Sequence, residues 1–222
     1  CLALAQKPAG KPVATISVNL QEGQTISGTT KVVATVQSQK LVLRVEFSVD
    51  DILREVDEST PYEFEWDTIT DAEGERRLKI VAILEGNQTA VKELKVKIDN
   101  GVDKGAAYHY QQAREAFTDG KFKEAVQSAR IALKADSSLK EARVLLIQAL
   151  LRLGRTREAD DAVEDFIRLF PDSIEGYEFR IAASLRRART VRNERELVRE
   201  AIDARRKIYE LRLKALGESS AP

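Results

Sequence analysis

The chain has 222 residues, of which 43% are hydrophobic and 32% are charged, and its formal net charge at pH 7 is zero. This balance excludes an intrinsically disordered chain and carries no overall signal for nucleic-acid binding. No apolar run approaches the roughly 20 residues that a bilayer-spanning helix needs. The single cysteine, Cys1, excludes an internal disulfide and a cysteine-based metal site.

Residues 1–11, CLALAQKPAGK, allow three interpretations. In the first, Cys1 is the lipid-attachment residue of a mature lipoprotein and the rest is a flexible tether. In the second, Ala3–Ala5 end a secretory signal that is cut before Gln6, and in the third the sequence begins at an arbitrary point. We favour lipid attachment because the sequence begins at its only cysteine. The first two interpretations predict an extracytoplasmic protein on the periplasmic or cell-surface side, and the first adds a membrane anchor.

Residues 12–100 contain short runs in which hydrophobic and polar residues alternate. The runs are VATISVNL, TKVVATVQ, LVLRVEFSV, YEFEW, RLKIVAIL and VKELKVKI, and turns with Gly, Asp or Pro separate most of them. In YEFEW, for example, Tyr62, Phe64 and Trp66 fall on one side of the strand and the two glutamates on the other. Six or seven strands of this kind predict an all-β sandwich with one solvated face.

The same segment resembles a bacterial immunoglobulin-like domain. The residues that carry the resemblance are ISG, VVATV, VEFSVDD, PYEFEWDT and LKIVAILEGNQTA, and PYEFEWDT, at Pro61–Thr68, is the most specific of them. The last hairpin departs from the family pattern, because Glu85-Gly86-Asn87 stands where relatives often have an Asp followed by Gly-Asn. Domains of this type are usually spacers or adhesion modules, so the resemblance implies binding or support rather than catalysis.

Several aspartates at the turns of this segment have side chains of the kind that calcium prefers. They are Asp50, Asp51, Asp57, Asp67 and Asp71. Their spacing matches no calcium-binding loop, and aspartate is common at turns because its side chain accepts local backbone hydrogen bonds. We therefore expect turn residues here, and neither a metal nor a cofactor.

After a linker at residues 101–105 the hydrophobic period changes from two to about 3.6, which predicts helices. The predicted helices span residues 106–118, 122–135, 139–153, 156–170, 174–188 and 193–216. The segment GKFKEAVQSARIALKADS, which begins at Gly120, aligns with the later segment GRTREADDAVEDFIRLFPDS, which begins at Gly154. Helix pairs that repeat at an interval of about 34 residues predict an all-α stacked array. We expect this array over residues 106–222, with the charged last helix as a cap.

This second segment resembles the tetratricopeptide (TPR) repeat family. Gly120 and Gly154 at the turns and Pro171 at the close of a repeat carry the resemblance. Two residues depart from the pattern, because Ser137 replaces a closing proline and Ile147 replaces a small residue. The resemblance implies a concave surface, formed by the first helix of each pair, that binds peptide segments of a partner protein.

By family position, the partner-binding residues of this surface are Tyr110, Arg114, Phe117, Val144, Gln148, Leu151, Arg152, Leu185 and Arg186. Aromatic, aliphatic and arginine side chains together are typical of an interface core. The family's carboxylate clamp is not supported, because Tyr110 and Arg114 occupy its first two positions. Alternatively, Tyr110 and Phe117 merely pack against neighbouring helices.

No enzyme is expected, because His109 is the only histidine and no nucleophile, phosphate-loop or zinc motif accompanies it. The basic run Arg186–Arg195 suits either anionic lipid headgroups or, as we favour, a solvated turn beside acidic residues. We therefore expect a non-catalytic scaffold that docks on a partner protein or membrane complex, and no nucleic acid. The alternatives are a carbohydrate- or cell-wall-binding accessory module and a transient assembly factor.

Overall fold

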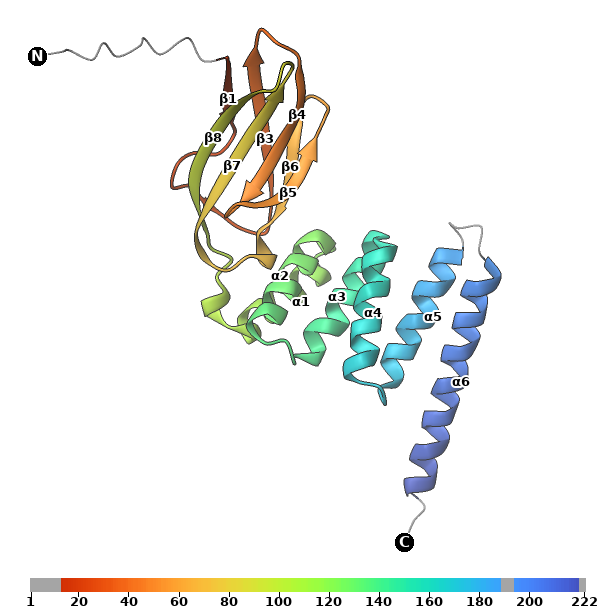
Figure 1. The fold of residues 1–222 in the computed structure, drawn as a ribbon. Coiled ribbons are helices and arrows are strands. Elements are labelled where there is room, and N and C mark those ends of the chain that lie inside the picture. The colour runs from red at the N-terminus through yellow and green to blue at the C-terminus, as the bar shows by residue number, and fades with distance from the viewer. Residues whose placement is uncertain (1–12, 189–193, 220–222) are drawn as a thin grey trace, which may run out of the picture. The chain divides into compact units, whose positions relative to one another are not determined.

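The structure, a computed structural model, describes residues 13–188 and 194–219. The chain divides into two compact units, the first ending at Gly101 and the second beginning at Val102. The first unit is built from strands and the second from helices (Figure 1). The predicted combination of an all-β domain with an all-α domain is therefore confirmed.

The described part of the first unit is a sandwich of two sheets. The smaller sheet has the order β1 (Ala14–Val18), β3 (Thr29–Ser38), β6 (Tyr62–Asp67), and the larger has the order β2 (Thr25–Ile26), β8 (Gln88–Ile98), β7 (Gly74–Leu84), β4 (Val42–Val49), β5 (Ile52–Asp57). All neighbouring strands are antiparallel except β2 and β8, which run parallel. The short 3-10 helix η1 (Thr68–Thr70) follows β6.

The predicted alternation places aromatic side chains between the two sheets. Tyr62, Phe64 and Trp66 of β6 are buried, and Phe47 of β4 lies against them with its ring centroid 5.7 Å from that of Phe64. The rings of Phe64 and Trp66 stack at 6.0 Å. Because aromatic rings bury large apolar areas, this cluster forms the centre of the sandwich core.

Two strands were not predicted from the sequence. The two-residue strand β2 is too short for any pattern, and β5 has almost no buried residue. β5 pairs with β4 alone, at the edge of the larger sheet, and the turn between them holds Asp50 and Asp51 at φ values of 48° and 65°. An edge strand that faces solvent shows no alternation of apolar residues, so only its pairing with β4 reveals it.

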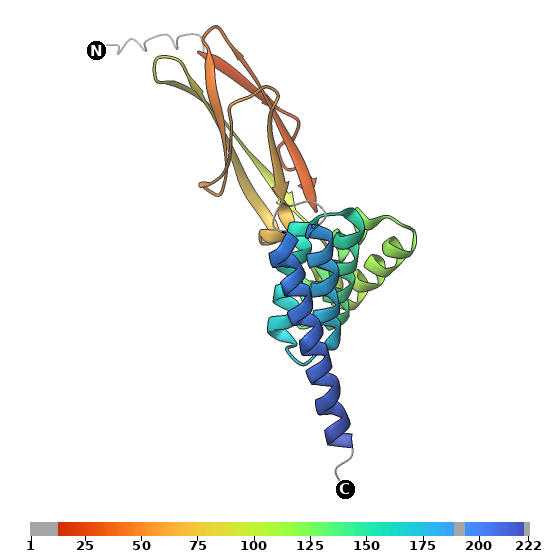
Figure 2. The same ribbon diagram turned by 90° about the vertical axis from the view of Figure 1, so that its right-hand side faces the viewer.

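The described part of the second unit contains the 3-10 helix η2 (Val102–Lys104) and a row of α-helices in which each packs on the next (Figure 2). The helices are α1 (Ala106–Thr118), α2 (Phe122–Ala135), α3 (Lys140–Leu153), α4 (Thr156–Leu169), α5 (Ile174–Ala188) and α6 (Glu194–Ser219). These bounds match the predicted helices within three residues. Gly120 and Gly154 close the α1–α2 and α3–α4 hairpins with positive φ, a conformation that glycine adopts without strain.

Small residues allow these helices to approach closely. Ala113, Ala125, Ala129 and Ala159 have no exposed surface, and Phe166 fills the space between α4 and α5. Ile147, which departs from the small residue expected at its position, is also fully buried. The helical unit therefore has its own apolar core.

Candidate interaction surfaces

One candidate surface is a groove with a volume of about 240 Å³ that residues of α1, α3 and α5 line. Its lining comprises Tyr110, Lys140, Glu141, Val144, Leu145, Gln148 and Glu175. We call it the inner groove. Three of the predicted partner-binding residues, Tyr110, Val144 and Gln148, therefore meet in one place.

Charged side chains at this groove are held by neighbours. The ammonium group of Lys140 lies 3.0 Å from the carboxylate of Glu175 and within 6 Å of the ring centroids of Phe166 and Phe170. The guanidinium of Arg114 lies 5.9 Å from the ring centroid of Tyr110. The inner groove thus offers an aromatic ring, an amide and a fixed ion pair to a bound segment.

The other predicted residues lie elsewhere. Phe117 is half-buried and meets Phe122 edge to face, and Leu151 is only 8% exposed, within the helical core. Arg152 is exposed, and Arg186 donates a hydrogen bond to the backbone oxygen of Leu151. Family position had placed Phe117 and Leu151 on the binding surface, but packing against neighbouring helices removes most of their area from it. Cys1, the predicted lipid-attachment residue, lies outside the described residues.

Leu185, also predicted for the inner surface, lines a different groove. This groove has a volume of about 580 Å³, and its lining comprises Glu178, Ile181, Leu185, Val198, Ala201, Ile202, Arg205, Ile208, Tyr209 and Arg212, all from α5 and α6. We call it the terminal groove. The sequence analysis assigned α6 a capping role and missed this surface, although the apolar residues Val198, Ile202 and Tyr209 follow a helical spacing.

Buried polar contacts connect α4, α5 and α6. The side chain of Asp160 is 12% exposed and lies 2.7 Å from the guanidinium of Arg187. Burial raises the pKa of Asp160, whereas the positive charges of Arg187 and Arg180 act in the opposite direction and Glu200 adds to the increase. Ser184, which has no exposed surface, donates a hydrogen bond of 3.1 Å to Glu200. These contacts fix how α5 sits between its neighbours.

Replacing Asp160 by asparagine is expected to change the pH dependence of stability. Folding raises the pKa of the Asp160 carboxyl, so the native chain binds the carboxyl proton more tightly than the unfolded chain does. The contribution of Asp160 to the free energy of unfolding therefore falls as the pH rises above 3.8, the ordinary pKa of an aspartate. Asp160→Asn removes that titration. Its stability relative to the wild type should therefore be lowest at acidic pH and should rise towards neutral pH. Urea unfolding followed by helical circular dichroism measures this, and a relative stability that falls over the same interval would contradict it.

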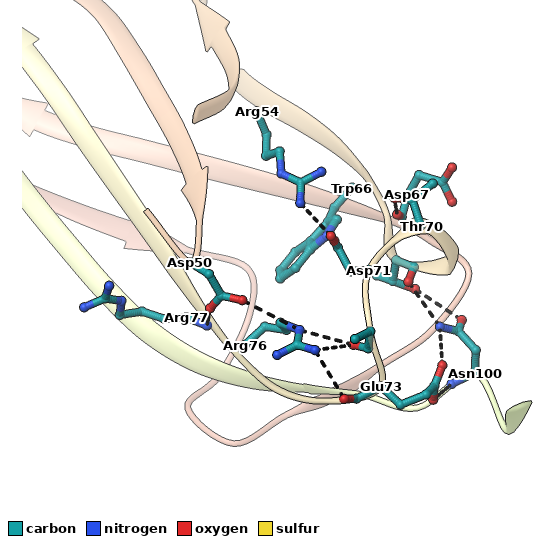
Figure 3. Close-up of polar contacts among 12 residues, drawn as sticks. Asp50, Arg54, Trp66, Asp67, Thr70, Asp71, Glu73, Arg76, Arg77 and Asn100 are labelled. Carbon is teal, nitrogen blue, oxygen red and sulfur yellow. Dashed lines mark hydrogen bonds and ion pairs between the residues drawn. The ribbon is translucent and has the colours of Figure 1, made fainter. Parts of the chain in front are cut away.

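A polar cluster occupies one end of the sandwich (Figure 3). Trp66 donates its indole hydrogen bond to Asp71 at 2.6 Å, and Arg54 contacts the other oxygen of the same carboxylate at 2.5 Å. Asn100 contacts Glu73 through both its backbone and its side-chain nitrogen, at 2.7 and 3.2 Å. These side chains bind one another and the backbone, so the cluster has a structural role.

Like Asp71, three more of the aspartates considered as calcium ligands accept protein hydrogen bonds. Asp50 accepts one from the backbone of Arg77, and Asp51 pairs with the guanidinium of Arg77. Asp57 accepts backbone bonds from Ser59 and Glu63, the latter of which contributes most to lowering its pKa. Within the described residues, no group of three or more His, Cys, Asp or Glu side chains is arranged to hold a metal ion.

The lone histidine lies in the helical unit. His109 is buried on α1 and contacts Tyr108 edge to face, with ring centroids 5.2 Å apart. This places it within a packed environment, away from the lining of both grooves. No helix of the described segments has the length and apolar character needed to cross a membrane.

Comparison with known proteins identifies the sandwich. Residues 12–120 match the family described as "Bacterial Ig domain". The N-terminal domain is a bacterial Ig domain. The match covers the whole described sandwich and continues through α1, and the comparison assigns no family to the rest of the helical unit.

Solved structures resemble the chain only weakly. The fibronectin(III)-like modules of Clostridium thermocellum CbhA share 21% sequence identity, and the match covers 39% of this chain and 98% of theirs with a TM-score of 0.34. A polysaccharide lyase shares 10% identity over 89% of this chain and 34% of its own, with a TM-score of 0.28. No curated protein matched the chain. TM-scores this low carry no argument about function. The surfaces of the two units are therefore the basis for a proposal.

Proposed function

We propose that this protein is a non-catalytic interaction protein. Its helical unit is a short TPR-type array that holds a segment of a partner protein in the inner groove. The Ig domain acts as a spacer or support. The mechanism is positional, because no bond is made or broken and the groove only selects and retains its partner.

Helix spacing and turn geometry support the TPR-type assignment. α1, α3 and α5 begin at Ala106, Lys140 and Ile174, so successive helix pairs start at equal intervals. A TPR unit takes about 34 residues, and both intervals match that length. A glycine in the left-handed conformation closes each of the first two hairpins. In arrays of this kind each hairpin buries its apolar face only by stacking on the next, which agrees with the continuous core from α1 to α5.

The observation that carries the proposal is the meeting of Tyr110, Val144 and Gln148 in the inner groove. Val144 and the ring of Tyr110 provide apolar contact, while the amide of Gln148 can both donate and accept hydrogen bonds with a peptide backbone. The Lys140–Glu175 pair at 3.0 Å adds a charged contact at the same site. A groove with apolar contacts and a few placed polar groups is typical of a peptide-binding site.

The carbohydrate-binding alternative has less support. It requires an exposed aromatic platform, but the aromatic side chains of the described Ig domain, Phe47, Tyr62, Phe64 and Trp66, are all buried. A permanent subunit and a transient assembly factor both use a protein-binding groove. The lifetime of the captured complex would distinguish them.

Replacing Tyr110 and Gln148 together by alanine should weaken partner capture about tenfold, because residues at the centre of an interface contribute most of its binding energy. Quantitative mass spectrometry of proteins retained from the native source by immobilised wild-type and variant chains measures this. The matched control is Gln112→Ala, an exposed residue of α1 outside the groove. If the double variant retained the partners in the same amounts as the wild type does, the proposal would be contradicted.

We also propose an extracytoplasmic, membrane-anchored location, which rests on the sequence prediction for Cys1. Intact-mass spectrometry of the protein isolated from its native membranes tests this. Acyl chains on Cys1 would support the anchor. A mature end at Gln6 without lipid would contradict it.

A further inference from the structure

We infer that the terminal groove between α5 and α6 is a seat for an amphipathic helix of a partner protein, one that carries acidic residues along the edges of its apolar face. The helix would pack on α5 and α6 in the way that α5 packs on α3 and α4. This surface is separate from the inner groove, so the inference does not depend on the proposed function.

The packing of α5 on the preceding hairpin shows what such a seat looks like. Arg180 and Arg187 of α5 pair with Glu164 and Asp160 of α4, at 3.4 and 2.7 Å. Gly176 of α5 lies so close to α4 that an added Cβ would be 2.9 Å from side-chain atoms of Phe166 and Ile167. On the α3 side, Arg186 of α5 donates to the backbone oxygen of Leu151. The seat is thus formed jointly by α3 and α4.

The terminal groove occupies the equivalent position on the next hairpin. α5 follows α3 at the repeat interval, and α6 follows α4 at a slightly larger interval. The larger interval aligns the buried positions Ala159 and Val163 of α4 with Leu197 and Ala201 of α6. The intervals then place the equivalents of Leu151, Asp160, Glu164 and Ile167 at Leu185, Val198, Ile202 and Arg205, and all four of these line the terminal groove.

The chemistry of the seat changes between the two hairpins. The two acidic residues of α4 that pair with arginines of α5 correspond to Val198 and Ile202 on α6, which are 39% and 55% exposed. Leu185 and Tyr209 of the same groove are 47% and 65% exposed. A contiguous apolar patch is uncommon on a free surface and marks an interaction site. The terminal groove therefore lies at the position of a helix seat but favours an apolar row on its occupant.

The residue pattern of α6 indicates that a helix can pack on each of two sides of α6. Its buried row towards α5 comprises Leu197, Ala201, Ala204, Ile208 and Leu211, at intervals of four, three, four and three residues. The residues one position later form a second row with the same intervals, Val198, Ile202, Arg205, Tyr209 and Arg212, and all five line the terminal groove. Intervals of this kind are those of a packed helix seam. Figure 1 shows α5 and α6 side by side, with α6 extending beyond α5 at its C-terminal end.

Charge distinguishes the possible occupants. Within the described residues Arg205 has no ion-pair partner, and Arg212 is 3.9 Å from Glu178. Arg195 and Arg199 of α6 are exposed and likewise lack an ion pair among the described residues. A second copy of the chain would bring its own Arg205 and Arg212 into the shared groove, where like charges repel, whereas an acidic residue on a partner helix would pair with Arg205. The surface thus favours an acidic amphipathic helix over self-association.

A synthetic helix tests the inference with the purified full-length chain. The probe is a fluorescent peptide with the sequence of Ile174–Ala188 carrying Arg180→Leu and Arg187→Leu, so that leucines face Val198 and Ile202, and Tyr177→Glu to meet Arg205. We expect this peptide to bind, to bind at least tenfold more weakly to Ile202→Glu, and to lose affinity with added salt. The peptide with the unaltered α5 sequence should bind at least tenfold more weakly than the probe.

The control variant is Leu169→Glu, because Leu169 is similarly exposed on α4 and lies outside the terminal groove. It should bind the probe like the wild type. Tyr209→Ala, which removes an apolar contact without adding charge, should also weaken binding if the groove is the seat. Three results would overturn the inference: no binding of the probe, equal binding by Ile202→Glu, or a wild-type dimer in sedimentation that Ile202→Glu dissociates, which would identify a second copy as the occupant.

Discussion

Phe166→Ala is expected to lower the free energy of unfolding of the helical unit by about 3–5 kcal/mol, the usual cost of truncating a buried phenylalanine to alanine. Phe166 has no exposed surface, and its ring centroid lies 5.1 Å from that of Phe170 and 6.3 Å from that of Phe179. The truncation leaves a cavity between α4 and α5 beside Gly176, where an added Cβ would lie 2.9 Å from the ring of Phe166. The backbone cannot easily collapse into this cavity, because the pair of the buried Asp160 with Arg187 of α5 holds the two helices in place.

Urea unfolding followed by helical circular dichroism measures this effect. Leu169→Ala is the matched control, because Leu169 lies on the same helix and is 49% exposed. The control should change the free energy of unfolding much less, since exposed substitutions rarely cost more than about 0.5 kcal/mol. Equal effects of the two variants would show that Phe166 is not a central packing residue.

Asn100→Ala is expected to destabilise the Ig domain by about 2–3 kcal/mol, because it leaves the buried backbone N–H of Gly28 without its acceptor and removes a donor from the buried backbone oxygen of Thr68. The side-chain oxygen of Asn100 accepts a hydrogen bond of 2.7 Å from the backbone of Gly28 and lies 3.2 Å from the hydroxyl of Thr68, whose shorter hydrogen bond, of 2.8 Å, goes to the backbone oxygen of Gly28. Its side-chain nitrogen donates to the backbone oxygen of Thr68 and to Glu73. Asn100 therefore connects three separate segments at the end of the sandwich, and Thr68 has no exposed surface through which water could replace it.

Tryptophan fluorescence reports this change selectively, because Trp66 is the only tryptophan of the chain and lies in the Ig domain core. Lys92→Ala, an exposed position on β8, provides the control and should leave the unfolding midpoint nearly unchanged. An Asn100→Ala midpoint equal to that of the control would refute the role assigned to the buried amide.

The sequence by itself determined much of the local structure. Alternation in YEFEW placed Tyr62, Phe64 and Trp66 in the core, and the helical period located the helices closely. These predictions succeed because each depends on periodicity within one element, which records the face that is buried. β5 was not predicted, because an exposed edge strand has no buried face and therefore shows no alternation of apolar and polar residues.

Only the tertiary structure decided which residues form a surface. Family position placed Leu151 and Leu185 on one concave face, but packing buries Leu151 in the core and assigns Leu185 to the terminal groove. The burial of Asp160 was equally hidden, because its partner Arg187 lies on the next helix, far from it in the chain. Apolar periodicity within a helix or strand indicates that a neighbour covers one of its faces. Which neighbour does so, and which residues remain open to a partner, depends on how distant helices pack, and periodicity within a single helix does not encode that.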